Sequence, residues 1–187
     1  MTTGYQIKEQ DALYYLTLQV VDWVDIFTRQ CYRDIVVDSL RYCQMNKSLQ
    51  VLAFVIMSSH VHLIANSGTG ELSATLRDFK KYTSKAILQQ VAEGRESRRE
   101  WMLNRFEFAA SRHGRNDRYQ LWTHENHAVH LYSPDFIREK LDYLHDNPVR
   151  AGLVTKPEDY LYSSARSYAG LDGVLDVVQI DLPWITY

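Results

Sequence analysis

A long apolar segment, followed at once by a second strand-like segment, constrains the fold more than any other feature of the sequence. Residues 49–57 are almost continuously apolar, which is typical of a central β-strand with both faces covered. The polar pair Ser58-Ser59 interrupts this run, and residues 60–65 resume a strand pattern. We therefore expect a sheet whose interior contains residues 49–57.

Helical and extended patterns lie on both sides of these strands. Residues 13–21 are rich in β-formers, whereas residues 34–46 and 71–91 carry apolar side chains at helical spacing. Residues 119–132 look extended, with Trp122 as the expected anchor. The expected order is therefore strand, helix, two strands, helix, strand and helix.

The last two helices have different signals. The stretch 93–118 is dense in charge and predicts a helix followed by a mobile loop. The final helix is expected to begin after Ser133, the N-cap, with Pro134 at its first position. It should run to about Asp146, because Pro148 is expected to end it.

Two helices on one face of an antiparallel sheet are the economical arrangement for this order, which predicts an α+β fold of ferredoxin-like type. A chain of 187 residues is long enough for one ordinary domain with a sizeable core. We expect that domain to span residues 1–154. Residues 155–187, which have aromatic anchors but no clear period, should form a C-terminal extension packed on it.

The chain has the features of a cytoplasmic protein. No apolar run approaches the ~20 residues that a membrane span requires. Residues 1–8 are polar and lack the apolar core of a signal peptide. Cys31 and Cys43 are expected to share one helix, so a disulfide framework is not indicated and a reducing compartment fits.

The charge balance limits the nucleic-acid partners. A net charge of -2 argues against a protein that coats duplex DNA nonspecifically, because such binding needs many cationic phosphate contacts. A local basic patch remains open, on the long predicted helix and just after the final one, or these side chains simply form a solvated face. The candidates are Arg77, Lys80, Lys81, Lys85 and Arg150. The 13 Tyr and 4 Trp residues could stack on unpaired bases or fill half-buried sheet positions.

Two pairs of residues carry the candidate chemistry. His60 and His62 are two apart on a predicted strand, so both imidazoles leave the same face and can share one cation. Tyr143 and Asn147 are four apart on a predicted helix, so they lie on one face and can supply a nucleophile and an oxygen ligand. From spacing alone, a structural or solvent-exposed role is favoured for the histidines, and a core aromatic with a helix cap is favoured for Tyr143 and Asn147. His145 points elsewhere and is not a candidate ligand.

The combination of these motifs resembles the HUH endonucleases, and in particular the REP-associated tyrosine transposases, which use a single tyrosine. Residues 57–64 resemble their histidine–hydrophobic–histidine motif, with Ser58-Ser59 in place of the usual Pro-Asn. Residues 143–154 closely resemble the segment that holds their nucleophile. Residues 79–83 and 162–168 also look like this family, so the resemblance covers most of residues 13–170 in the right order.

The resemblance implies a catalytic domain in residues 1–154 and a role for each candidate. His60, His62 and Asn147 would bind a divalent cation, and Tyr143 would attack a phosphodiester of single-stranded DNA beside a hairpin. The product would be a 5′-phosphotyrosine link and a free 3′-hydroxyl, which permits strand transfer. The family implies Mg²⁺ or Mn²⁺, while ligand chemistry alone favours Mn²⁺ or Zn²⁺.

Two alternatives remain from the sequence. One is a hairpin-binding protein that has the fold but no activity. The other is a small metallohydrolase that combines His60 and His62 with His124, His127 or His130. The oligomeric state, monomer or homodimer, is also open.

Overall fold

The computed structural model describes residues 6–112 and 118–180. Its antiparallel sheet has the strand order β2-β3-β1-β4. The strands are β1 (Tyr14–Gln19), β2 (Leu49–Ile56), β3 (His60–Ser67) and β4 (Val129–His130). The helices are α1 (Gln30–Asn46), α2 (Leu72–Glu93), α3 (Arg99–Ser111), α4 (Pro134–Arg150) and α5 (Ala165–Tyr168). Three short 3-10 helices are η1 (Val21–Trp23), η2 (Ile26–Thr28) and η3 (Pro157–Asp159).

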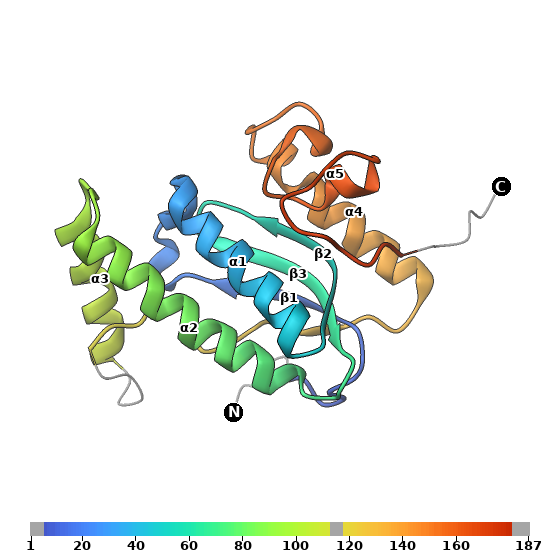
Figure 1. The fold of residues 1–187 in the computed structure, drawn as a ribbon, viewed down its shortest axis with the longest axis horizontal. Coiled ribbons are helices and arrows are strands. Elements are labelled where there is room, and N and C mark those ends of the chain that lie inside the picture. The colour runs from blue at the N-terminus through green and yellow to red at the C-terminus, as the bar shows by residue number, and fades with distance from the viewer. Residues whose placement is uncertain (1–5, 113–117, 181–187) are drawn as a thin grey trace.

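The sheet is covered on both faces, as the apolar β2 predicts. The prediction that residues 49–57 form a central strand is wrong, because β2 lies at one end of the strand order, where residues 160–180 cover its free edge. Helices α1 and α2 pack on one face, over a core that includes Leu16, Phe54 and Leu63 (Figure 1). Helix α4 packs on the opposite face, over Val55 and Ile64. The order strand–helix–strand–strand–helix–strand confirms the expected α+β ferredoxin-like fold, to which α3 and α4 are added.

Most predicted elements are present, with different ends. The N-cap prediction is confirmed, because the Ser133 side chain accepts a hydrogen bond from the Phe136 amide. Helix α1 begins four residues earlier than expected, at Gln30. Its first turn has no side-chain cap and depends instead on the burial of Tyr32. The predicted loop after the charge-rich helix includes residues 113–117, which lie outside the described residues.

The sequence analysis predicted that Pro148 ends the last helix, and this prediction is wrong. Helix α4 continues to Arg150 with Pro148 inside it. A proline removes only one backbone donor, and here its ring is buried on the face of α4 that packs on the sheet. Arg150 therefore belongs to the helix instead of following it.

The remaining chain covers the two edges of the sheet. Residues 120–126 follow the edge of β1, where the Thr123 amide donates to the Gln19 carbonyl over 2.8 Å. Residues 160–180 follow the edge of β2, where the Ile56 amide donates to the Tyr162 carbonyl over 2.9 Å. Covered edges prevent pairing with other chains. The division of the chain after residue 154 stays a prediction.

Within the described residues, no helix has both the length and the apolar character needed to cross a membrane. Both cysteines lie in α1, as expected, and neither forms a disulfide.

Trp122 is the anchor that the sequence predicts. It is buried between Phe27 and Phe79, and its indole nitrogen donates to Thr83 Oγ1 over 2.9 Å. This bond joins the segment along the β1 edge to the middle of α2.

Thr83→Val should therefore lower the free energy of unfolding by about 1–3 kcal/mol, because the buried indole N–H loses its acceptor while the volume is unchanged. Denaturant unfolding measures the effect. Ser111→Ala removes a hydroxyl that donates to a helix carbonyl at an exposed position, and it should change stability by less than about 0.5 kcal/mol. Equal effects of the two substitutions would contradict the anchoring role of this bond.

Candidate active site

The two histidines lie side by side on β3, on the sheet face that α4 covers. His60 and His62 alternate with Val61 and Leu63, which face the other core. Their ring centroids are 4.7 Å apart. The prediction that the two imidazoles share a face is confirmed.

Helix α4 brings Tyr143 to this pair. Leu141 and Leu144 are buried against the sheet, which fixes the helix on this face. The Tyr143 ring centroid then lies 6.2 Å from that of His62. Tyr143 is 42% exposed, whereas His62 is buried, so the phenol is open to a ligand from solvent while the imidazole is held in place.

Burial keeps both histidines neutral. It lowers the pKa of His60, and it lowers the pKa of His62 to about 3, an effect that the neighbouring His60 strengthens. Nδ1 of His62 lies 3.0 Å from Thr17 Oγ1, and Nδ1 of His60 lies 3.3 Å from Ser59 Oγ. These contacts engage Nδ1 of each ring, and the Leu16 backbone is a further hydrogen-bond partner of His62. Neutral imidazoles with one engaged nitrogen are the form that binds metals.

Tyr15 is a further residue of this site that the sequence analysis did not select. Its ring centroid lies 5.2 Å from that of His62 and 6.4 Å from that of Tyr143. Burial raises the pKa of Tyr15, and Tyr143 raises it further, so this phenol keeps its proton. Its buried hydroxyl is not satisfied by any hydrogen bond among the described residues. The register of β1 with β3, which the sequence does not reveal, is what places it here.

Asn147 and Arg150 follow Tyr143 along α4. Asn147 Nδ2 donates to the Tyr143 carbonyl over 2.7 Å, which leaves its amide oxygen for another partner. The Arg150 guanidinium lies over the Tyr143 ring, 4.9 Å from its centroid. The extension of α4 through Pro148 creates this contact, because positions seven apart share a helix face. No hydrogen bond joins Asn147 to either histidine within the described residues, so its role as a ligand stays a prediction.

The other histidines are not part of this group. His130 pairs with Tyr14, whose ring belongs to the α1–α2 core, so its side chain leaves the opposite face of the sheet from His62. His145 points away from Tyr143, and its Nε2 lies 2.8 Å from Ser164 Oγ. Within residues 6–112 and 118–180, no cluster of three or more His, Cys, Asp or Glu side chains could hold a metal ion. This geometry gives no support to the metallohydrolase alternative.

A groove of about 840 Å³ lies between α2 and the segment that starts at residue 118. The four basic candidates of α2 line it together with one arginine that was not among them. These residues are Arg77, Lys80, Lys81, Lys85 and Arg118. The groove lies on the α2 side of the sheet, away from the histidine pair. It is thus a separate surface from the site at Tyr143.

The basic residues of the groove are not equivalent. Lys81 and Lys85 are exposed and form no ion pair with any described residue. Arg77 is paired with Asp78. Lys80, in contrast, points into the protein: its Nζ donates to the Thr123 carbonyl over 2.7 Å and to Asn126 Oδ1 over 2.8 Å. Burial lowers the pKa of Lys80 to about 8, which still leaves it mostly charged at neutral pH.

The fold and the site together describe an α+β protein with a tyrosine beside a histidine pair. No protein-family model and no curated protein sequence matches the chain. The chain is similar to a solved structure of a REP-associated tyrosine transposase bound to a REP hairpin. The match covers 100% of this chain and 99% of that chain, with a TM-score of 0.60 and 17% identity. At this identity, the likeness shows the shared fold.

The contacts of Lys80 predict a structural role. Lys80→Met keeps the aliphatic stem but removes the donor that holds residues 123–126, so it should lower the free energy of unfolding by about 1–3 kcal/mol. Lys81→Met is the matched control in the same groove and should stay within about 0.5 kcal/mol of the wild type. Denaturant unfolding of both variants decides the point. A Lys80→Met protein as stable as the control would show that this ammonium is not needed for the loop.

Proposed function

We propose that this protein is a metal-dependent endonuclease and strand transferase that cuts single-stranded DNA beside a hairpin, with Tyr143 as nucleophile. The observation that carries the proposal is the exposed phenol of Tyr143 beside the buried imidazole of His62, which in turn lies against the half-buried imidazole of His60 on the same face of the sheet. If the histidine pair and the tyrosine of α4 had only structural roles, nothing would require them to lie beside each other.

The similar solved structure supports the same reading. That protein is a tyrosine transposase bound to a hairpin, and this chain matches its fold over the full length. The motifs that suggested the resemblance, at residues 57–64 and 143–154, are the ones that the fold brings together.

The donor set fits a divalent cation. Nε2 of His60 and Nε2 of His62 are neutral nitrogen ligands, and the Asn147 oxygen is the proposed third ligand. Nitrogen and amide-oxygen ligands suit Mn²⁺, and the abundance of Mg²⁺ in cells makes it the other candidate. A cation held there supplies charge neutralisation on the scissile phosphate and orients it for in-line attack.

The residues of the chain then perform the cleavage. Tyr143 Oη forms a bond to phosphorus while the bond from phosphorus to the 3′-oxygen breaks, and the proton that Oη gives up to solvent is balanced by one that the leaving 3′-oxygen takes from solvent. This yields a 5′-phosphotyrosine and a free 3′-hydroxyl. Arg150, over the phenol ring, places positive charge beside the reacting groups. Attack of another 3′-hydroxyl on the phosphotyrosine reverses the step, so that a strand is transferred instead of hydrolysed.

Exposed Lys81 and Lys85, with Arg77 and Arg150, are the proposed phosphate contacts. Lys80 contributes mainly by holding the wall of the groove. Because the net charge is -2, this local patch is the part of the surface suited to a polyanion.

Tyr143→Phe should abolish the covalent adduct with a hairpin-bearing oligonucleotide, while hairpin binding changes little. Denaturing gel electrophoresis of labelled DNA measures the adduct, and filter binding measures affinity. Tyr82→Phe is the control, since Tyr82 is an exposed tyrosine on α2, between the basic residues. If the adduct persists in Tyr143→Phe and vanishes in Tyr82→Phe, the assignment of Tyr143 as the nucleophile is wrong. Binding without any adduct in the wild type points to the non-catalytic alternative.

His60→Ala and His62→Ala should each reduce cleavage by at least about 100-fold, since one imidazole and one amide hold a cation poorly. Asn147→Ala should raise the Mn²⁺ concentration needed for half-maximal cleavage. His130→Ala, on the opposite sheet face, is the control and should cleave normally. Cleavage at the wild-type rate in excess EDTA would rule out the metal-dependent mechanism.

A further inference from the structure

Trp23 is a large apolar side chain that the fold leaves open beside the histidine pair. It lies in η1, in the turn between β1 and α1, and it is 59% exposed. Its ring centroid is 5.6 Å from that of His60, with the two planes at 82°. One edge of the indole thus borders the site, and much of its surface faces solvent.

The backbone at this position is strained. Asp22 has φ 51° and Trp23 has φ 54°, so two consecutive residues with side chains adopt the left-handed conformation that favours glycine. The buried neighbours Val21 and Val24 explain why the turn is anchored to the core, but the indole gains little burial in return. Strain of this kind persists where the surrounding structure imposes it, and it is concentrated at functional sites.

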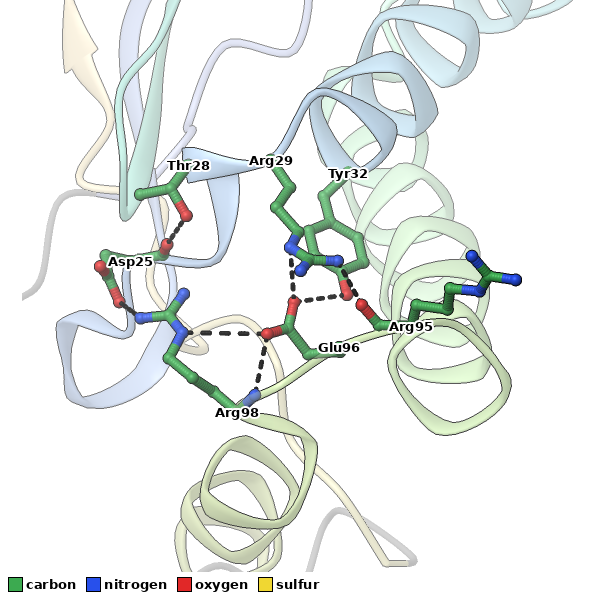
Figure 2. Close-up of polar contacts among 7 residues, drawn as sticks. All are labelled: Asp25, Thr28, Arg29, Tyr32, Arg95, Glu96 and Arg98. Atoms are coloured by element: carbon green, nitrogen blue, oxygen red, sulfur yellow. Dashed lines mark hydrogen bonds and ion pairs between the residues drawn. The ribbon is translucent and has the colours of Figure 1, made fainter.

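An ionic network around the buried carboxylate of Glu96 holds the end of this turn (Figure 2). Asp25 binds the Arg98 guanidinium over 2.7 Å. Arg98 in turn donates its backbone amide to Glu96, whose carboxylate also binds Arg29 and the Tyr32 hydroxyl. Glu96 is buried, so breaking this network is costly. The segment after Trp23 is therefore fixed to the junction of α2 and α3, and the indole is presented from a rigid support.

We propose that Trp23 is a stacking platform for one unpaired nucleobase next to the scissile phosphate. This inference rests on the proposed function of the site. An exposed indole offers a flat apolar face, and stacking on aromatic side chains is a sequence-tolerant way to bind single strands. The exposed carboxylate of Asp22 disfavours a phosphate at the same place, so the contact is to a base and not to the backbone. Stacking there would set which phosphodiester lies between His60 and Tyr143.

The test measures whether the contributions of the Trp23 indole and of one base to the binding affinity depend on each other. The probe is a DNA hairpin with single-stranded thymidine flanks, together with a series that carries one abasic site at each flank position in turn. Binding is measured in the Tyr143→Phe background, where no adduct forms. One abasic position should weaken binding about tenfold, within the range for loss of one stacked base. Trp23→Ala should weaken binding of the intact probe similarly, and the same abasic site should then cost nothing more.

Two further variants separate stacking from folding. Trp23→Gly relieves the left-handed backbone, so it should unfold at an equal or higher denaturant concentration and yet lose the stacking contribution. Tyr42→Ala removes an aromatic of similar exposure, 57%, from α1 on the opposite side of the sheet, and it should bind every probe as the wild type does.

The outcomes distinguish this inference from the function on which it rests. If the wild-type chain forms the covalent adduct but Trp23→Ala and Trp23→Gly bind all probes normally, the platform is wrong and the proposed function stands. The platform is also wrong if the loss of affinity caused by Trp23→Ala adds in full to the loss caused by the abasic site at every flank position. Failure of the wild-type protein to bind any hairpin probe overturns both.

Discussion

The packing of α4 on the sheet is the interaction on which the candidate site depends. Leu141 and Leu144 lie on Val55 and Ile64, and this apolar contact decides which face of the sheet is reached by Tyr143. Without it, the histidines would be two imidazoles on an exposed sheet surface. The same contact excludes water from His62, which lowers its pKa and keeps the imidazole neutral. One hydrophobic interface thus brings Tyr143 to the histidine pair and sets the protonation state of His62.

The site combines burial and exposure within a short distance. His62 and the hydroxyl of Tyr15 are buried, while Tyr143 and Trp23 remain open to solvent. For the proposed function, a rigid, buried floor with an open rim suits a reaction on one phosphodiester of a long strand.

The sequence predicted those parts of this arrangement that follow from local patterns. Strand alternation placed His60 and His62 on one face, helical spacing put Asn147 one turn after Tyr143, and Ser133 marked the start of α4. What it could not predict depends on contacts between distant segments. Pro148 would break an isolated helix, but the burial of its ring stabilises the continuation of α4 to Arg150. From its sequence context Lys80 is expected to be a solvated lysine, but in the structure it binds the carbonyl of Thr123, 43 residues further along the chain. The left-handed backbone at Trp23 has no sequence signal, since no glycine marks it.

The basic groove and the histidine pair lie on different faces of the sheet, which bears on how a chain of net charge -2 would bind the polyanionic substrate of the proposed function. The exposed lysines line a groove on the α2 side, and the histidine pair lies on the α4 side of the sheet. For the proposed function, a hairpin held by the groove must therefore send its single strand around the sheet to reach Tyr143. The nucleotides cut would then differ from those that provide most of the electrostatic attraction, and base stacking near the site would be needed to fix their register.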